Sequence, residues 1–377
     1  MTEHNEAGPV DILMFAEDPG AANFLAPLDP MIRKAGWNGV TLAVGLAADI
    51  FSRRGVSHLN PGNDNNRSGS LLAELKPRLV LAGTASNPDT LGLQLIAYAK
   101  NNSMTTVAAV DAAMNAELRF CGRTQNPLAY APDWLLVPDA AVADTYVRLG
   151  MPAARVVACG NPHHDFVITR GNDWRKNDRR AARKRIFPDA PESARFVVFV
   201  SEGSARVMRN VAGEPVAGNA RGPGASAGRS EIALQMLLDA LGGSADKPYL
   251  VLRIHPKDQP ADYAQFAGAI DLLNADGDPL ETVCAADLAV GTTSMLVTES
   301  ALVGRPVIAI VPEPAEDCWL PLIGLGVIPV ARTARDVARL VSEKLQSGAN
   351  AGGGEVETMR GDSGERTMNA LRQILAA

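Results

Sequence analysis

The sequence predicts an α/β fold of two domains in series, each built on a parallel β-sheet. Length is the first reason, because a chain of 377 residues is long for one hydrophobic core. In both halves, short and almost continuously apolar segments alternate with segments of helical periodicity, a pattern typical of parallel sheets covered on both faces. The halves are separated by residues 166–194, which are dense in Arg and Lys and also hold Pro188 and Pro191.

The apolar segments of the first half predict the strands of an N-terminal domain, residues 1–165. They span residues 11–16, 39–44, 79–82, 105–110, 134–137 and 156–158. Residues 91–100 and 140–149 lie between such segments and have helical periodicity. Because the connections are helical, we expect neighbouring strands to run parallel.

The same alternation resumes at residue 195 and predicts a C-terminal domain, residues 195–347. The expected strands span residues 195–200, 249–254, 288–290, 307–310 and 328–330, and the expected helices span residues 231–241, 294–303 and 334–346. Residues 166–194 are expected to form a hinge, as a solvated helix or a linker. Residues 209–229 are rich in Gly, Ala, Pro and Ser, so they form either a lid or a disordered segment.

The last segment, residues 348–377, combines a Gly-rich link with a helix. Residues 348–354 are expected to be a flexible link, and residues 365–375 a helix. Met368, Leu371 and Ile374 give that helix an apolar face. We therefore expect it to pack back on the N-terminal domain.

Composition excludes several classes of protein. The net charge of −6 argues against a general nucleic-acid binder. No segment approaches the roughly 20 apolar residues of a membrane span, and the N-terminal residues lack the apolar core of a secretory signal, so we expect a cytoplasmic protein. The histidines and the cysteines lack the spacing of metal ligands, so we expect no metal and no cofactor. The cysteines are Cys121, Cys159, Cys284 and Cys318, and buried reduced thiols are the simplest interpretation.

Two adjacent acids follow the first predicted strand. Glu17 and Asp18 stand before Pro19-Gly20, at a strand end where ligands bind in open α/β sheets. A partly buried carboxylate has the raised pKa that a general base requires. The alternative is a capped helix start, in which the acids satisfy helix N–H groups. In the same loop, Gly20 and Asn23 are candidates for the acceptor side of a cleft.

A second polar turn follows the strand at residues 156–158. It reads Gly160-Asn161-Pro162-His163-His164-Asp165, a sequence typical of a sharp turn at a strand end. Adjacent histidines point in different directions, so a shared metal is not expected. We assign Asn161 and His164 to the acceptor side and interpret His163 as part of an interdomain turn.

The C-terminal domain has a more informative strand end. The strand at residues 249–254 ends in His255-Pro256, followed by Lys257, and Pro256 should end the strand because it lacks an N–H group. An imidazole at this position can donate to a phosphate oxygen. Small residues at the tip of the preceding strand suit a phosphate or a sugar, and these are Ser201, Gly203 and Ser204.

The run Gly291-Thr292-Thr293-Ser294 ends another strand and opens a helix. Hydroxyl groups and unpaired N–H groups at a helix N-terminus form an anion site, so Thr292, Thr293 and Ser294 are candidates for binding phosphate. The alternative is that Thr293 or Ser294 simply caps the helix. Glu299 lies about one turn further along, where it either accepts hydrogen bonds from a ribose or faces solvent.

In their order and spacing, these motifs resemble GT-B glycosyltransferases. The resemblance is carried by Glu17-Asp18-Pro19-Gly20, His255-Pro256 and Thr292-Thr293-Ser294, together with Val110-Asp111, Arg119-Phe120 and Gly160-Asn161-Pro162. The most similar branches are bacterial and use cytidine nucleotides, namely enzymes like sialyltransferases, polysialyltransferases, Kdo transferases and CDP-glycerol glycerophosphotransferases. The sequence departs from the acidic motif of these branches, because Pro19 separates the acids from Gly20.

The resemblance implies two Rossmann-like domains with a ligand cleft between them. It also implies transfer of a sugar from a nucleotide donor to a hydroxyl acceptor without a metal, in polysaccharide or natural-product biosynthesis. A CMP-sugar is favoured over a UDP-sugar. Asp18 or Glu17 would be the base, with His255, Pro256 and Lys257 beside the donor phosphate and Glu299 on the ribose.

Other functions remain open at this stage. One is a nucleotide-sugar epimerase or hydrolase of the same architecture, although the Arg-Pro-Glu loop familiar in non-hydrolysing epimerases is missing after the first strand. Another is a non-catalytic nucleotide-sugar binding protein. The expected partners are the donor and the acceptor, without nucleic acid or an integral membrane segment, and a homo-oligomer is left open.

Overall fold

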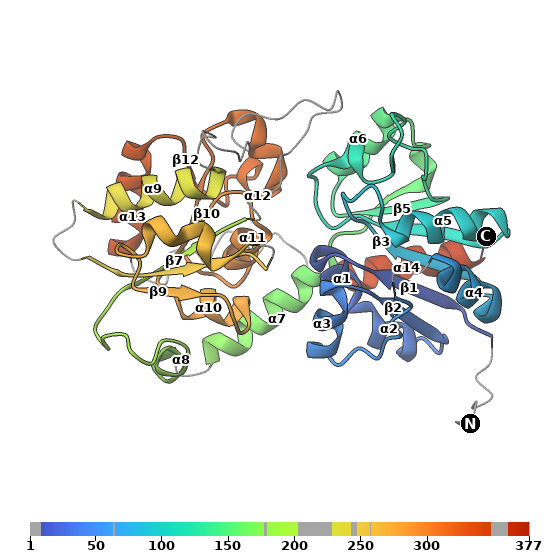
Figure 1. The fold of residues 1–377 in the computed structure, drawn as a ribbon, viewed down its shortest axis with the longest axis horizontal. Helices are drawn as coiled ribbons and strands as arrows, with labels where there is room; N and C mark the ends of the chain where they lie inside the picture. Colours follow the sequence, from blue (N-terminus) through green and yellow to red (C-terminus); the bar gives the residue numbers. More distant parts are fainter. Residues whose placement is uncertain are drawn as a thin grey trace. The chain divides into compact units, whose positions relative to one another are not determined.

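The chain folds into two compact units, each with its own sheet and core (Figure 1). The computed structural model describes residues 9–62, 65–176, 179–202, 228–242, 247–256, 258–347 and 361–376. Unit 1 takes the chain up to Phe166 and again from Arg360, and unit 2 takes Val167–Met359. The division falls inside α7, Pro162–Lys176. Residues 203–227 and 348–360 lie outside the described part. They include the Gly-rich link, 348–354, and most of the segment 209–229 that was predicted to be a lid or disordered, whose last residue, Arg229, begins α9.

Unit 1 is built on a six-stranded parallel sheet of order β2-β1-β3-β4-β5-β6. Its strands are β1 Ile12–Ala16, β2 Gly39–Ala43, β3 Leu79–Gly83, β4 Thr105–Ala109, β5 Trp134–Val137 and β6 Val156–Ala158. Every residue of β1 is buried, as expected for a strand with a parallel neighbour on each side and helices on both faces. The predicted α/β class is confirmed for this unit, because each expected strand is present.

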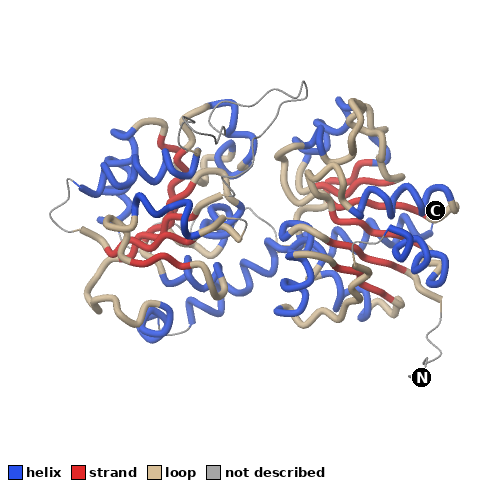
Figure 2. The backbone as a smooth tube through the Cα atoms, viewed as in Figure 1, coloured by secondary structure: helices blue, strands red, loops and turns tan. Residues whose placement is uncertain are grey.

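Helices cover both faces of the unit 1 sheet (Figure 2). They are α1 Pro19–Leu25, α2 Leu28–Lys34, α3 Leu46–Arg53, α4 Asn65–Leu75, α5 Leu91–Asn101, α6 Ala140–Leu149 and α14 Ser363–Ala376, with short 3₁₀ turns at Ala116–Leu118 and Ala153–Arg155. Alternate residues of β1 point to opposite faces. Ile12 and Met14 join a core with α1, α2 and α14, whereas Leu13 and Phe15 pack with α4 and α5.

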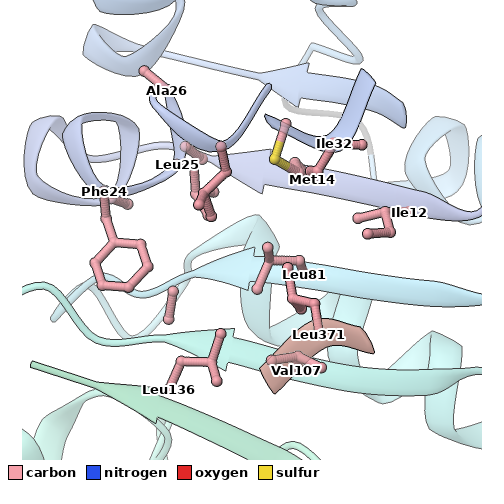
Figure 3. Close-up of a cluster of buried hydrophobic side chains, with 14 of the residues drawn as sticks. Ile12, Met14, Phe24, Leu25, Ala26, Ile32, Leu81, Val107, Leu136 and Leu371 are labelled. Carbon is pink, nitrogen blue, oxygen red and sulfur yellow. The ribbon is translucent and has the colours of Figure 1, made fainter. Parts of the chain in front are cut away.

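The helix α14 is part of the unit 1 core. Met368, Leu371 and Ile374 are buried in the cluster that includes Ile12 and Met14. In Figure 3, Leu371 lies beside Val107 of β4. The Arg78 guanidinium also donates to the Leu375 carbonyl at 3.3 Å. A segment more than 200 positions away in the sequence thus completes the core around the central strands.

Unit 2 repeats the architecture with a parallel sheet of order β12-β11-β10-β7-β8-β9. The strands are β7 Phe196–Val200, β8 Tyr249–Arg253, β9 Leu272–Asn274, β10 Leu288–Gly291, β11 Val307–Ile310 and β12 Val330–Ala331. The helices are α8 Arg179–Ile186, α9 Arg229–Gly242, α10 Pro279–Ala285, α11 Met295–Leu302, α12 Pro321–Gly324 and α13 Ala334–Ser347, with 3₁₀ turns at Pro260–Phe266 and Pro314–Trp319. The sequence did not predict β9, because three partly exposed edge residues give no apolar run.

Residues 166–194, expected to form a hinge, are largely helical. The greater part of α7 and all of α8 belong to unit 2. Arg179 and Arg183 of α8 bind Asp287, and Arg183 also donates to the Ala285 carbonyl at 2.7 Å. The basic residues of α8 therefore fix it to the end of α10. His163, interpreted as a turn residue, lies in the first turn of α7 and is buried.

No helix in the described part of the chain combines the length and apolar character needed to cross a membrane.

Candidate functional site

In unit 2, the loops after β7 and β8 meet at the carboxyl edge of the sheet. These two strands are neighbours, so their ends lie together. The Ser201 hydroxyl accepts a hydrogen bond from the His255 backbone N–H at 2.8 Å and donates to the Asp258 carboxylate at 2.9 Å. Tyr263 donates to the same Asp258 oxygen at 2.9 Å. Ser201 thus fixes the chain at His255, which is half-buried, whereas Pro256 is exposed.

The loop after β7 also contacts the loop after β10 through Glu202, a residue that the sequence reasoning missed. One Glu202 carboxylate oxygen accepts from the Thr293 N–H at 3.0 Å and from the Thr293 hydroxyl at 2.7 Å. The other oxygen pairs with Arg229. An acid directly after a buried strand was the available signal, but its neighbours Gly203 and Ser204 were chosen instead. Gly203, Ser204 and Lys257 lie outside the described residues.

Arg229, the first residue of α9, joins two acids from different parts of unit 2. Its guanidinium pairs with Glu202 and, at 2.5 Å, with Glu316. It also lies over the Trp319 ring, 5.1 Å from the centroid. Burial raises the pKa of the Glu316 carboxyl, Arg229 lowers it, and the negative charge of Glu202 raises it further. The cluster contains two carboxylates for one guanidinium, all with side chains at most 16% exposed.

The three hydroxyl residues after β10 have different environments. Ser294 caps α11, since its hydroxyl accepts from the Leu296 N–H at 3.4 Å. Thr293 donates to Glu202, as described above. Thr292 is 1% exposed, and within the described part of the chain its hydroxyl has no hydrogen-bond partner. An unsatisfied buried hydroxyl costs about 1–3 kcal/mol, so Thr292 is suited to bind a ligand atom.

Two further residues complete this edge. Glu299 of α11 is 7% exposed, which excludes the alternative that it faces solvent. Gly291 ends β10, where an added Cβ would lie 2.9 Å from the Val200 carbonyl oxygen and 2.7 Å from Val297. Only glycine therefore allows the β7 and β10 ends to approach as closely as they do.

In unit 1, the structure gives different roles to the two acids after β1. The Glu17 carboxylate accepts from the Thr90 hydroxyl at 2.5 Å, from the Leu91 N–H at 3.3 Å and from Asn87 at 3.4 Å. These donors form the start of α5, so Glu17 stabilises that helix N-terminus. Asp18 occupies the N-cap position of α1 but makes no capping hydrogen bond to it. Of the two acids, Glu17 is thus the one whose carboxylate accepts from the start of α5.

A buried ion pair lies behind Asp18. The Arg119 guanidinium contacts Asp111 at 2.8 Å and also donates to the Thr84 hydroxyl at 2.7 Å. Burial alone would lower the pKa of Arg119, but Asp111 and, to a smaller extent, Asp18 raise it above the ordinary value. The sequence reasoning quoted Asp111 and Arg119 in the family resemblance without giving them a role. Thr84, directly after β3, was missed.

Gly20 and Asn161 hold this pair against the neighbouring strand ends. A Cβ at Gly20 would lie 1.8 Å from an Asp111 carboxylate oxygen, so the acid packs directly on the α1 backbone. The Asn161 amide donates to the Asp111 carbonyl at 3.1 Å. Gly20, Asn161 and Asp111, which follow β1, β6 and β4, are thus brought together at one edge of the sheet.

The other residues assigned to the acceptor side belong to a structural cluster. Arg54 donates to the Asn23 side chain at 3.2 Å and contacts the His163 ring nitrogen at 3.1 Å. His164 is half-buried in α7, one residue before Asp165. The Asp165 carboxylate accepts from the Gly364 N–H at 2.8 Å, and burial raises its pKa. This part of α7 therefore ties the start of α14 into unit 1.

No group of three or more His, Cys, Asp or Glu side chains suited to a metal ion occurs among the described residues.

Comparisons with known proteins give likeness of fold only. No protein-family model and no curated protein matches the sequence. Among solved structures, the UDP-GlcNAc 2-epimerase of Neisseria meningitidis bound to UDP-GlcNAc has a TM-score of 0.69 at 11% identity, over 97% of this chain and 100% of that one. The Methanocaldococcus jannaschii enzyme in complex with UDP-GlcNAc and UDP gives 0.65 at 13%, over 97% and 100%.

A more distant match is a variant of the wall teichoic acid polymerase TagF with CDPG. Its TM-score is 0.58 at 12% identity, over 99% of this chain and 90% of that one. Identities this low show the architecture and nothing finer. The chain has a GT-B-like fold of two Rossmann-like units, as predicted from the order of its motifs.

Proposed function

We propose that this chain is a metal-independent glycosyltransferase that uses a nucleotide-activated sugar. The observation that carries the proposal is the contrast between the two carboxyl edges. Unit 2 gathers groups whose chemistry suits phosphate at the ends of its strands and at the start of α9, namely His255, Thr292, Thr293 and Arg229. Unit 1 gathers the acids Asp18 and Asp111 around a buried guanidinium.

The donor would bind in unit 2. The Thr292 hydroxyl and the His255 imidazole would donate to the phosphate, and Glu299 would accept from the ribose. As the bond from the anomeric carbon to the phosphate oxygen breaks, negative charge grows on the leaving nucleotide. Oriented donors at that position stabilise the charge in the way that a metal does in other enzymes. The solved neighbours support this assignment, since the epimerase structures hold UDP-GlcNAc or UDP-GlcNAc and UDP, and the TagF variant was solved with CDPG.

Asp18 is the proposed base. It would take the proton of an acceptor hydroxyl while that oxygen forms its bond to the anomeric carbon. Glu17 is less suited, because three donors around the start of α5 hold its carboxylate. Both oxygens with which Glu17 could accept a proton already accept hydrogen bonds from these donors. Both a CMP-sugar and a UDP-sugar fit the chemistry, and we favour the CMP-sugar from the sequence motifs.

Binding measurements test the donor assignment. Calorimetric titration with CMP, CDP, UDP and GDP should give saturable binding of at least one pyrimidine nucleotide. His255→Ala should weaken that binding about tenfold or more, the effect of losing a charge-assisted hydrogen bond. His58→Ala is the matched control, because His58 lies in unit 1, where its ring contacts the Val56 carbonyl at 3.0 Å and packs near Phe51. Normal binding by the His255 variant would exclude the phosphate role.

A second candidate is a nucleotide-sugar epimerase. It is favoured by the higher TM-scores of the UDP-GlcNAc 2-epimerases, 0.65 to 0.69 for the two described above, against 0.58 for TagF. Incubation with UDP-GlcNAc, followed by proton NMR, separates the candidates. An epimerase forms a second sugar nucleotide with the UDP intact, whereas a transferase needs an acceptor and releases the nucleotide. Asp18→Asn should abolish turnover and retain nucleotide binding.

A further inference from the structure

Two of the residues proposed to bind phosphate in unit 2, Thr293 and Arg229, make their polar contacts with a carboxylate of the protein itself, that of Glu202. We define the anion seat as the Thr293 N–H, the Thr293 hydroxyl and the Arg229 guanidinium. All three are directed at Glu202. We infer that Glu202 occupies the anion seat in the ligand-free protein and that the donor phosphate must displace it. This inference rests on the proposed function and adds an internal competitor to its donor site.

The anion seat has the chemistry of a phosphate site. A guanidinium offers paired N–H groups, and a backbone N–H with a hydroxyl from the same residue adds two more donors. One Glu202 oxygen receives both Thr293 bonds while the other receives Arg229. Two oxygens of a phosphate can accept the same bonds, since phosphate and carboxylate oxygens accept from the same forked donors.

Charge makes the two occupants mutually exclusive. Arg229 already balances two carboxylates, Glu202 and Glu316, in a largely buried cluster. A phosphate that entered beside them would place a third anion around one cation, where burial strengthens the repulsion. If Glu202 leaves as phosphate enters, Arg229 again faces two anionic groups. Replacement of the Glu202 carboxylate by phosphate therefore changes the net charge around Arg229 less than binding of phosphate beside Glu202 would.

The contacts of Glu202 allow its side chain to move without its backbone. Its N–H donates to the Ser230 hydroxyl at 3.0 Å, and its carbonyl accepts from the same hydroxyl at 3.1 Å. The adjacent Ser201 N–H donates to the Arg253 carbonyl at 3.0 Å. The backbone is thus anchored at Glu202 itself and at the residue before it. Rotation of the Glu202 side chain is enough to open the anion seat.

The probe that isolates the anion seat is inorganic pyrophosphate, used beside CDP, UDP and the nucleosides cytidine and uridine. Glu202→Gln removes the competing charge, so pyrophosphate and nucleotide affinity should rise about tenfold, while nucleoside affinity stays within about twofold. Thr293→Val removes a donor of the anion seat and should weaken pyrophosphate binding. All affinities come from calorimetry, with thermal denaturation to verify the fold.

Two control variants separate occupation of the anion seat from a change in charge. Glu281→Gln removes a negative charge elsewhere in unit 2, where Glu281 pairs with Arg185 at 3.2 Å. Glu316→Gln removes the second partner of Arg229 without touching Thr293. Neither should tighten pyrophosphate binding more than about twofold. If Glu316→Gln tightens it as much as Glu202→Gln does, or if Glu202→Gln has no effect, the inference is wrong.

A crystal structure of the parent protein with pyrophosphate tests the inference even if the Glu202→Gln variant fails to fold. We expect the Glu202 carboxylate to leave Thr293, and a phosphate oxygen to lie within hydrogen-bonding distance of the Thr293 N–H. An unmoved Glu202 would overturn the inference. If Glu202→Gln binds pyrophosphate more tightly but prefers no nucleotide over pyrophosphate, Glu202 does occupy the anion seat and the proposed function is rejected. If the protein binds nucleotide and Glu202→Gln leaves that affinity unchanged, the proposed function stands and the role of Glu202 is rejected.

Discussion

Ser201 and His255, 54 positions apart in the sequence, are joined by a hydrogen bond of 2.8 Å from the His255 N–H to the Ser201 hydroxyl. The same hydroxyl donates to Asp258. One buried side chain therefore sets the path of the loop that carries the proposed phosphate-binding imidazole.

Ser201→Ala should both destabilise unit 2 and weaken nucleotide binding. The change leaves the His255 N–H and one Asp258 oxygen without the hydroxyl, which costs about 1–3 kcal/mol. Urea denaturation measures the loss, and calorimetry measures the binding. The control is Ser342→Ala on the exposed face of α13, where the serine hydroxyl accepts from the Gln346 side chain at 3.0 Å. Full nucleotide affinity in the Ser201 variant would show that the loop keeps its path without this bond.

Gly20→Ala should disrupt the acid cluster of unit 1. The new Cβ would overlap the Asp111 carboxylate, which lies 1.8 Å from its ideal position. Relief of such overpacking costs about 1–3 kcal/mol, and turnover should fall further because Asp18 is next to the displaced segment. Gly242→Ala is the matched control, because its Cβ would meet nothing within 4 Å. An undisturbed melting temperature for Gly20→Ala would contradict the packing described for Asp111.

Asp111→Asn should be among the most destabilising single changes in unit 1. It leaves the buried Arg119 guanidinium without its carboxylate, and breaking a buried pair costs about 3–5 kcal/mol. The control is Asp89→Asn, which breaks the exposed pair with Arg123 and should leave the unfolding midpoint within error of the parent. Equal effects of the two changes in denaturant titrations would show that the Arg119–Asp111 pair is no more buried than the Arg123–Asp89 pair.

Asp165 should make a contribution to folding stability that depends on pH in the opposite direction to that of a typical ion-paired acid. Burial raises its pKa in the folded state, so folding favours the protonated form. Its stabilising contribution is present below the ordinary pKa of Asp, about 3.9, and is lost as the pH rises through the raised folded value. Asp165→Asn should therefore gain stability relative to the parent as the pH rises from about 3.9 to 7.

Asp336 provides the control of opposite sign for this experiment. A hydrogen bond from Thr333 lowers the pKa of Asp336, so its contribution is present above the ordinary pKa and is lost as the pH falls. Asp336→Asn should thus lose stability relative to the parent as the pH rises toward about 3.9 from below, and should change little relative to the parent from about 3.9 to 7. Parallel pH trends for the two variants in urea titrations would contradict the environment assigned to Asp165.

The fold was predictable because buried parallel strands are apolar along their whole length. Segments such as residues 12–16 and 196–200 have no alternation to confuse with a surface strand, and the residues between them have helical periodicity. The short edge strand β9, Leu272–Asn274, was missed because its partly exposed residues lack that signature. Residues 166–194 read as a hinge because the partners of the α8 arginines, such as Asp287, lie about a hundred positions later.

The candidate site was predictable only where its residues follow a strand. The positions of His255 and Thr293 at strand ends were predicted because both residues follow apolar runs. Their partners were not, since Glu202 reaches Thr293 across 91 positions and Arg229 reaches Glu316 across 87. The choice between Glu17 and Asp18 likewise depends on the start of α5, more than 70 positions away. Sequence patterns place a side chain on an element, whereas its partner depends on how the elements pack.

The position of α14 in the unit 1 core sets an order of folding during synthesis. Unit 2 is one continuous stretch, Val167–Met359, so all of its strands are synthesised before α14. Met368, Leu371 and Ile374 must still fill the core beside β1. The part of the protein that is translated first is therefore completed last, and it must wait with an open apolar face while the second half folds.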